Sequence, residues 1–354
     1  MKALVLSGGA GTRLRPLTYS TAKQLVPVAN KPVLVHVLEN IRDIGVREVG
    51  VIVGDRAEQI KQAIGTGDRL GLRITYLSQD APLGLAHCVM IAKDFLGDED
   101  FVMYLGDNIF ADGIRPAAAT FRRRRPDAHL VVAKVEDPNQ YGVAELEPDG
   151  SVRALVEKPA KPRSDLAVTG AYFFTSAIHQ AVRAIRPSRR GELEITDAVA
   201  QLIATGRTVT AERYEGYWKD TGKVDDLLEC NRVLLERVSA RIAGEVDAAT
   251  RLHGNVVVEA GARITNSHLI GPLIIGAGTT VHNSRIGPYA AIGKNCVISD
   301  STLQDSITLD GVTIRGVQRL QHSLIGHRSD VRAARGTAHR RLIIGDHTRA
   351  EIPA

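Results

Sequence analysis

Glycines and cations gather at the start of the chain. Three glycines follow the short apolar run 2–6 within four positions: Gly8, Gly9 and Gly11. Without side chains, the backbone can approach a ligand closely, and its N–H groups can point at phosphate oxygens. Arg13 adds a planar fork of donors that suits phosphate, and Lys23 adds a second cation. The segment therefore predicts a phosphate-binding loop just past a first strand.

The glycine spacing excludes two common phosphate-binding loops. A Walker loop ends in Gly-Lys-Ser/Thr, and the dinucleotide fingerprint G-x-G-x-x-G requires a third glycine at a spacing that this segment lacks. Taken alone, the glycines are equally compatible with an ordinary turn in an α/β protein.

A carboxylate and an amide follow two later apolar runs. Asp107 comes after the run 101–105, and magnesium takes oxygen ligands, often one or two carboxylates together with substrate phosphates. Asp107 is therefore a candidate metal ligand, although an isolated Asp at this place also suits a helix cap. Gln79 ends another run, and its amide can donate and accept together, as the edge of a pyrimidine requires. A solvated loop glutamine is the alternative.

The elements that must position these residues alternate between helix and strand. Helical spacing over 33–45 is followed by a strand at 46–54, a helix through 59–64 and a strand at 72–77. This order predicts an α/β fold with a Rossmann-like mixed, mainly parallel sheet and helices on both faces. Ligands of such sheets bind beyond the C-terminal strand ends, where the glycines and Asp107 are expected. Helical spacing resumes from Asp225 to about Ala243. We expect this helix to end a first domain, which would span residues 1–243.

The pattern changes after about Gly254. Aliphatic residues recur there at intervals of five or six: Val258, Ile264, Ile270, Ile275, Val281, Ile286, Ile292 and Ile298. A hexapeptide period predicts a parallel β-helix over 244–354, similar to the left-handed β-helix of hexapeptide-repeat proteins. Such domains often serve acyltransferases. Because the histidines here have no identifiable partner, we favour a scaffold role and self-association into a homo-oligomer.

The composition indicates which kinds of binding partner and which cellular compartment to expect. The net charge of +5 is mild for 354 residues, and the basic block 122–125 suits the solvated end of a helix better than a nucleic-acid patch. Three scattered cysteines give no disulfide framework, and no run approaches 18 apolar residues. We expect a cytoplasmic protein that binds neither nucleic acid nor a membrane.

The longer N-terminal pattern resembles a known signature. G-G-x-G-T-R-L-x-P-L-T, then Lys23, then P-V-x-x-K-P is similar to the motif of the sugar-1-phosphate nucleotidylyltransferases. Further matches are Q-x-x-P-x-G-L-A from Gln79, L-G-D-N around Asp107, Y-G-V at 141–143, E-K-P at 157–159 and R-G-E-L-E-I-T-D at 190–197. The resemblance covers nearly the whole chain, and its motifs are strong in the first 225 residues and weaker after them.

The resemblance implies a role for each matching residue. The nucleotide would be bound by Leu6, Gly8, Gly9, Gly11, Thr12, Arg13, Gln79, Gly84 and Asp107. The sugar phosphate would be bound by Tyr141, Gly142, Glu157, Lys158, Val168, Arg190 and Trp218. Asp107 and Asp220 would hold Mg²⁺ as the cofactor. Catalysis would depend on Arg13 at the triphosphate, Lys23 near the α-phosphate, and Asp107.

The implied reaction transfers dTMP from dTTP to glucose 1-phosphate and gives dTDP-glucose and pyrophosphate. The R-G-E-L-E-I-T-D segment and Gly345-Asp346-His347-Thr348-Arg349 near the C-terminus resemble members of deoxysugar pathways that use these substrates. Three alternatives remain at this point: the same chemistry with UTP or another sugar phosphate, a non-catalytic sugar-nucleotide-binding regulator, and acetyl transfer by the β-helix.

Overall fold

The chain folds into two compact units. The computed structural model describes residues 1–334 and 342–353. One unit comprises Met1–Ala10 with Leu34–Asp220, and we call it unit 1; unit 2 comprises Gly11–Val33 with Thr221–Ala354. The glycine-rich segment is thus divided, because Gly8 and Gly9 belong to unit 1 and Gly11 belongs to unit 2.

Unit 1 is built on a mixed sheet in the order β10-β9-β11-β6-β1-β4-β5, to which β8 is joined through β11 and β12 through β8. The strands are β1 (Lys2–Leu6), β4 (Glu48–Val53), β5 (Arg73–Ser78), β6 (Phe101–Leu105), β8 (Ala128–Lys134), β9 (Gly142–Leu146), β10 (Val152–Glu157), β11 (Leu166–Phe174) and β12 (Val209–Arg213). β1 pairs in parallel with β4 and β6, whereas β11 runs antiparallel to β6, β8 and β9. A separate ribbon joins β7 (Asn108–Phe110) to β13 (Trp218–Asp220).

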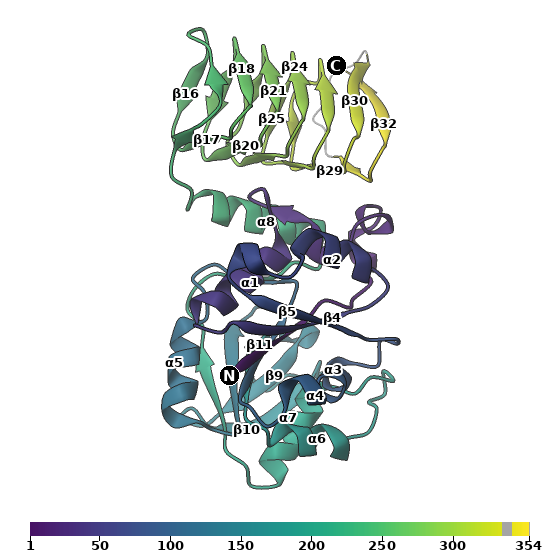
Figure 1. Ribbon diagram of the computed structural model, residues 1–354, viewed down its shortest axis with the longest axis vertical. Coiled ribbons are helices and arrows are strands. Elements are labelled where there is room, and N and C mark those ends of the chain that lie inside the picture. The colour runs from purple at the N-terminus through teal and green to yellow at the C-terminus, as the bar shows by residue number, and fades with distance from the viewer. Residues whose placement is uncertain (335–341, 354) are drawn as a thin grey trace. The chain divides into compact units, whose positions relative to one another are not determined.

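Helices cover both faces of this sheet (Figure 1). They are α1 (Val33–Asp43), α2 (Ala57–Ile64), α3 (Leu85–Ile91), α4 (Lys93–Leu96), α5 (Arg115–Arg124), α6 (Ile178–Ala184) and α7 (Ile195–Ala204). Side chains alternate along β11, because successive residues of a strand point to opposite faces. Phe174 lies in the core shared with α6 and α7, and Phe173 stacks on Phe121 of α5 at 5.5 Å between ring centroids. The fold predicted for this half of the chain is confirmed.

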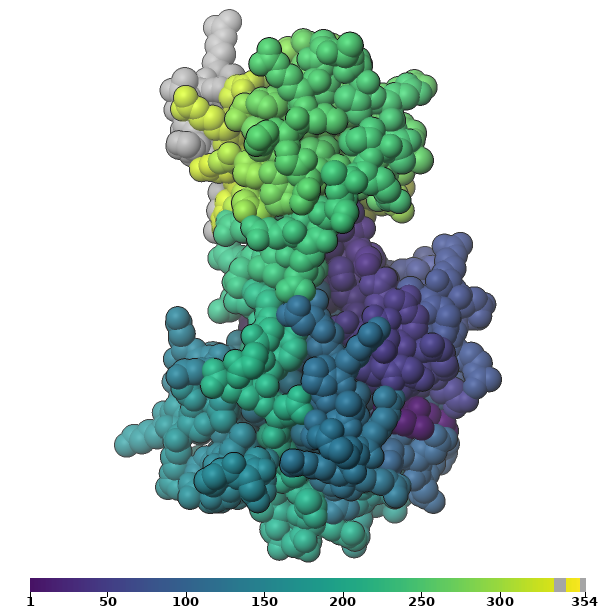
Figure 2. All heavy atoms as spheres, turned by 90° about the vertical axis from the view of Figure 1, so that its left-hand side faces the viewer, coloured from purple at the N-terminus to yellow at the C-terminus, as the bar shows by residue number. Residues whose placement is uncertain are grey.

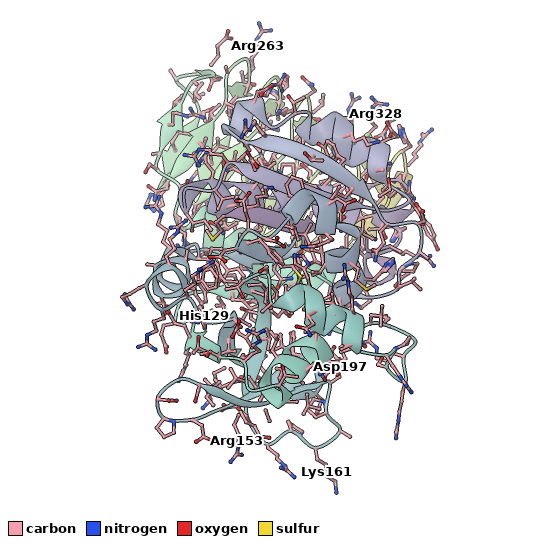
Figure 3. The ribbon with its side chains drawn as sticks, turned by 60° about the horizontal axis from the view of Figure 1, so that its bottom comes forward. His129, Arg153, Lys161, Asp197, Arg263 and Arg328 are labelled. Carbon is pink, nitrogen blue, oxygen red and sulfur yellow. The ribbon has the colours of Figure 1, made fainter. Side chains whose placement is uncertain are left out.

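A buried histidine makes the stability of unit 1 depend on pH. His129 of β8 is 1% exposed, and its Nδ1 lies 2.8 Å from Oγ1 of Thr210 (Figure 3). Burial is the main cause that lowers the pKa of His129 to about 4. Glu212 raises this pKa by a smaller amount, and Arg124 lowers it further. Between this pKa and the unfolded value of about 6.5, the unfolded chain binds more protons, so stability falls as the pH falls through this window.

Replacing His129 by a residue that does not titrate should therefore reduce the loss of stability as the pH falls. When the pH is lowered from 7 to 5, the free energy of unfolding of His129→Gln should fall by about 2 kcal/mol less than that of the wild type. Urea denaturation at both pH values measures the two changes. His253→Gln, which changes an exposed histidine, is the control. Equal losses in the wild type and His129→Gln would contradict the prediction.

Unit 2 begins with the segment 11–33, which has its own local structure. Three 3₁₀ turns span Thr12–Leu14, Leu17–Tyr19 and Lys23–Leu25, and a two-stranded hairpin joins β2 (Pro27–Val28) to β3 (Lys31–Pro32). The long helix that follows unit 1, α8, spans Val224–Leu235. The helix predicted to continue to about Ala243 ends earlier, because Arg241 and Ile242 form strand β14 and pair with Val257 and Val258. Pairing with the next coil outweighs the local helical spacing.

The rest of unit 2 is a parallel β-helix whose strands stack in three sheets, seen as short parallel arrows in Figure 1. The first sheet has β14 (Arg241–Ile242), β17 (Val256–Val258), β20 (Leu273–Ile275), β23 (Ala290–Ile292), β26 (Ile307–Thr308), β29 (Leu324–Ile325) and β31 (Ile343–Ile344). The second has β15 (Glu245–Val246), β18 (Arg263–Thr265), β21 (Thr280–His282), β24 (Val297–Ser299), β27 (Thr313–Arg315), β30 (Asp330–Ala334) and β32 (Arg349–Pro353). The third has β16 (Arg251–His253), β19 (His268–Ile270), β22 (Arg285–Ile286), β25 (Thr302–Gln304) and β28 (Leu320–Gln321).

Aliphatic stacking holds the coils together. Ile264 pairs with Val281, and Val281 pairs with Ile298, so that equivalent side chains of successive coils meet in the interior. All three are buried. At the turns, Asn266 and Asn283 adopt positive φ, which Asn tolerates better than most residues, and the Asn266 amide donates to Oδ1 of Asn283 at 3.2 Å. The hexapeptide pattern thus predicted this architecture correctly.

Candidate active site

The C-terminal ends of three neighbouring strands of unit 1 form one edge. The N–H of Ser7 donates to the carbonyl of Ile52 at 2.9 Å, and the N–H of Gly106 donates to that of Leu6 at 2.9 Å. A Cβ on Gly106 would lie 2.4 Å from Oγ of Ser7, so the absence of a side chain lets the two chain segments approach. Leu6 and Asp107 are therefore held at the same edge.

The structure brings Gln79 and Gly84 together beside Gly8. Gln79 follows β5, and its Oε1 lies 3.1 Å from the position that a Cβ of Gly8 would occupy. Its Nε2 donates to the carbonyl of Gly84 at 3.4 Å and lies 3.3 Å from Nδ1 of His87. The His87 contact was not predicted from the sequence. Its signal was its place in the first turn of α3, three residues after Gly84, where a helical side chain points back toward the preceding loop.

Gly84 joins this loop to the R-G-E-L-E-I-T-D segment. The N–H of Leu193 donates to the carbonyl of Leu83 at 2.8 Å, and the N–H of Ala86 donates to the carbonyl of Leu193 at 3.0 Å. Gly84 has φ +103°, and a Cβ there would lie 2.4 Å from the Leu193 oxygen. Only glycine suits this conformation and this close approach. Two motifs more than 100 positions apart therefore form one backbone-linked structure.

The β7–β13 ribbon ends in Asp220 on one strand and begins directly after Asp107 on the other. Asp107 immediately precedes β7, and Asp220, the last residue of β13, is the register partner of Asn108. Residues that face each other in an antiparallel pair have Cα atoms about 4.5–5.5 Å apart. The Asn108 amide donates to Oδ1 of Asp107 at 3.0 Å and accepts from Nε1 of Trp218 at 2.8 Å. Asn108, which is buried, therefore orients one carboxylate and links it to the single tryptophan.

This donor set fits a magnesium ion that is also bound by phosphate. Asp107 and Asp220 both carry carboxylates, the hard oxygen ligands that Mg²⁺ prefers, and the ion usually keeps positions for water and substrate oxygens. Within residues 1–334 and 342–353, no group of three or more His, Cys, Asp or Glu side chains is arranged to hold a metal alone.

The residues predicted for the sugar phosphate line a neighbouring part of unit 1. The rings of Tyr141 and Trp218 meet edge to face at 5.5 Å. Glu157 is the register partner of Gly142, and its Oε2 accepts from Oγ1 of Thr196 at 3.1 Å. A Cβ on Gly142 would lie 2.7 Å from Cγ2 of Thr196 and 3.8 Å from Cγ2 of Val168. Thr196 was missed as a site residue, although it lies within a motif that the sequence singled out.

Arg190 is shared among carboxylates in this structure. Its guanidinium lies 3.4 Å from Glu157, 3.4 Å from Glu192 and 3.3 Å from Glu194. Burial raises the pKa of Glu194, and the Ser188 hydroxyl, which donates to it at 2.9 Å, opposes this shift. Lys158 is exposed and its Nζ lies 3.9 Å from Glu157. The cluster thus orients the Glu157 carboxylate and presents two cations beside it.

The remaining predicted residues belong to unit 2. Gly11 has φ +64°, and a Cβ there would lie 2.9 Å from Cβ of Lys23 and 3.0 Å from Cγ2 of Thr18. Oγ1 of Thr18 donates to the carbonyl of Gly11 at 2.7 Å. The segment therefore folds back on itself and brings Lys23 beside Gly11. Thr12 and Arg13 follow in a 3₁₀ turn, and both side chains are exposed.

The α/β sheet followed by a β-helix gives the architecture of this protein, and comparison with known proteins gives its family. The nucleotidyl transferase family model matches residues 2–237. The chain therefore belongs to the nucleotidyl transferase family.

Two curated relatives match over almost their whole length. The glucose-1-phosphate thymidylyltransferase of Streptomyces griseus is 54% identical over 353 residues, which cover 99% of both chains. The enzyme of the same name from Streptomyces antibioticus is also 54% identical, with 99% of both chains covered.

A solved structure extends the likeness to three dimensions. A Bacillus anthracis protein assigned as a glucose-1-phosphate thymidylyltransferase, solved with a sucrose, is 33% identical. It superposes with a TM-score of 0.63, covering 68% of this chain and 98% of that one.

Proposed function

We propose that this protein is a magnesium-dependent enzyme that transfers dTMP from dTTP to glucose 1-phosphate and releases pyrophosphate. The observation that carries the proposal is the β7–β13 ribbon, in which Asp220 pairs with Asn108, and Asn108 donates to the carboxylate of Asp107. The contact of Gln79 with Gly84 supports it further. The two full-length Streptomyces relatives bear the name of this activity.

The reaction is an in-line displacement at phosphorus. A phosphate oxygen of glucose 1-phosphate forms a bond to the α-phosphorus of dTTP, the bond to the bridging oxygen breaks, and pyrophosphate leaves with the electron pair. Such a transfer requires positioning and charge stabilisation rather than a protein nucleophile. A magnesium ion held by Asp107 and Asp220 would neutralise negative charge on the donor.

The chain's own residues hold the two substrates. We propose that the loop containing Gly8, Gly9, Gly11 and Thr12 binds the triphosphate with Arg13, and that Lys23 neutralises the α-phosphate. Gln79 would accept from and donate to the thymine edge, because its amide carries both functions. Tyr141, Gly142, Lys158, Val168 and Trp218 would line the sugar side, where Glu157 would accept hydrogen bonds from the hydroxyls and Arg190 would bind the phosphate.

The test is a panel of nucleoside triphosphates with glucose 1-phosphate, with released pyrophosphate measured. We expect dTTP to give one pyrophosphate per dTDP-glucose, and EDTA to abolish the signal. A preference for UTP would identify a uridylyltransferase instead. Binding without turnover, followed through the emission of Trp218, would identify a nucleotide-binding regulator.

Changing Gln79 should weaken selection of the base. We expect Gln79→Ala to lower kcat/KM for dTTP about tenfold to a hundredfold, since a base edge then loses two partners in a partly buried site. The ratio of dTTP to dCTP turnover should fall with it. Gln180→Ala, which changes an exposed glutamine on α6, is the control. An unchanged ratio in Gln79→Ala would remove this residue from base selection.

The wider organisation follows the same proposal. We infer a catalytic domain over 1–243 and an accessory β-helix over 244–354, to whose first coil the last residues before this boundary add strand β14. The first coil supports self-association into a homo-oligomer, because β14, β15 and β16 each pair on one side with the next coil, and Ile242 and Leu252 are exposed. Light scattering tests this. All three cysteines are buried and none forms a disulfide, which suits work in a reducing cytoplasm. No helix in the described part of the chain is long and apolar enough to cross a membrane.

A further inference from the structure

The segment 11–33 belongs to the same compact unit as the β-helix. This segment carries four cations and no acidic residue: Arg13, Arg15, Lys23 and Lys31. In Figure 2 its purple spheres lie beside the green spheres of α8. Arg13 and Lys23, two of the residues proposed to bind the donor phosphates, therefore belong to the same compact unit as the β-helix.

Asp346, in the last coil, contacts this segment at one point. Its Oδ2 accepts from the Ser20 hydroxyl at 2.6 Å and lies 3.2 Å from the Thr21 hydroxyl. Its Oδ1 accepts from the N–H of His327 at 2.7 Å, so the carboxylate is fixed to the coil itself. A Cβ on the neighbouring Gly345 would lie 3.4 Å from Cβ of Pro16.

The tip of the β2–β3 hairpin provides a second point of contact. The N–H of Ala29 donates to Oδ1 of Asn231 on α8 at 3.0 Å, and the amide of buried Asn231 donates to the carbonyl of Tyr289 at 3.1 Å. The Asn30 amide donates to the carbonyl of Ile292 in the β-helix at 2.6 Å. Ala29 also packs against the cluster of Leu235, Val257 and Ile274.

The backbone of this tip is strained. Ala29 has φ 49° and Asn30 has φ 58°, as a two-residue hairpin turn of this hand requires. Alanine is unfavourable in this conformation because its Cβ approaches the following carbonyl, so the contacts with α8 and the β-helix must hold it there. Lys23 lies in sequence between this held tip and the Asp346 contact.

We infer that the β-helix is a positioning element for the phosphate-binding segment, and that Asp346 and Asn30 are positioning residues that fix Arg13 and Lys23 for the triphosphate. The inference rests on the proposed function for its kinetic consequence. It assigns the β-helix a role in donor binding rather than a separate activity, because its last coil and its Ile292 carbonyl hold a segment that carries two of the proposed phosphate ligands.

The test uses the full-length protein and two independent variants. Asp346→Ala removes the contacts with Ser20 and Thr21, and Asn30→Gly removes the amide while allowing the positive φ. Asp330→Ala is the matched control, because Asp330 lies in a neighbouring coil, is also partly buried and pairs with Arg332 within its own strand.

We expect the KM for dTTP to rise about tenfold in both variants while the KM for glucose 1-phosphate stays within twofold, since loosened ligands lose preorganisation toward one substrate. Hydrogen–deuterium exchange of residues 18–25 should accelerate in both variants and remain as in the wild type in Asp330→Ala. Unchanged exchange and an unchanged KM for dTTP, or equal increases in both KM values, would overturn the inference. If the wild-type protein lacks thymidylyltransferase activity, the proposed function fails, and the exchange measurement still decides whether the β-helix positions the segment.

Discussion

Asp107→Asn should lower kcat by about three orders of magnitude while leaving the fold intact. The substitution keeps the size of the side chain and its contact with Asn108, but it removes the negative charge of one of the two carboxylates proposed to hold the metal. A group that holds the metal at a transferring phosphate stabilises charge that develops in the transition state, and the loss of such stabilisation commonly costs a factor of 100 to 1,000 or more. The measurements are single-turnover pyrophosphate release and the Mg²⁺ dependence of the rate.

Asp98 gives the matched control, because it precedes strand β6 whereas Asp107 follows the end of that strand. Asp98 lies shortly before β6, is exposed and pairs with Lys93 at 2.8 Å. Asp98→Asn should keep wild-type turnover, and both variants should unfold at the wild-type urea midpoint to within experimental error. Near-normal turnover of Asp107→Asn with ordinary Mg²⁺ dependence would remove Asp107 from the metal site.

Gly84→Ala should produce the largest loss of stability among single methyl additions at this edge. The new Cβ would lie 2.4 Å from the carbonyl oxygen and 2.6 Å from the nitrogen of Leu193, both of them backbone atoms that cannot rotate away. The positive φ adds strain of about 1–3 kcal/mol. We expect a loss of about 3–5 kcal/mol in the free energy of unfolding by urea denaturation, together with loss of turnover, because Gln79 donates to the carbonyl of this residue.

Gly97→Ala separates the two causes. Gly97 ends α4 with φ +61° and ψ −138°, and a Cβ there would meet nothing within 4 Å. This variant carries the backbone strain without the collision, and it should lose about 1–2 kcal/mol and keep its activity. If Gly84→Ala were no less stable than Gly97→Ala, the close approach of Leu193 would not exist in solution.

Periodicity was sufficient to predict both architectures. Alternating helical and strand spacing predicted the α/β sheet, and aliphatic residues at intervals of five or six predicted the stacked coils in which Ile264, Val281 and Ile298 meet. Both patterns are local consequences of which face of an element is buried. The helix predicted to reach Ala243 was wrong beyond Leu235 because the residues that follow pair with a strand of the next coil, which local spacing does not reveal.

The site was predicted residue by residue but not as a set of contacts. Asp107, Gln79 and Glu157 are predicted site residues on the basis of their motifs, whereas the hydrogen bonds of Asn108, His87 and Thr196 to these residues emerged only from the fold. His87 lies on α3 and Thr196 on α7, so their distances to Gln79 and Glu157 depend on how the helices pack. Asn108 is the chain neighbour of Asp107, but the orientation of its amide depends on the pairing of β7 with β13.

The sequence alone determined the two architectures and the residue types available for phosphate, metal and base, because each is encoded in short patterns of spacing and side-chain chemistry. Only the tertiary structure decided that the segment 11–33 joins the β-helix in one compact unit, that Asp346 contacts Ser20, and that Asp220 faces Asn108. These pairs are separated by more than 100 positions, and only the closure of the whole chain brings them within hydrogen-bond or register distance.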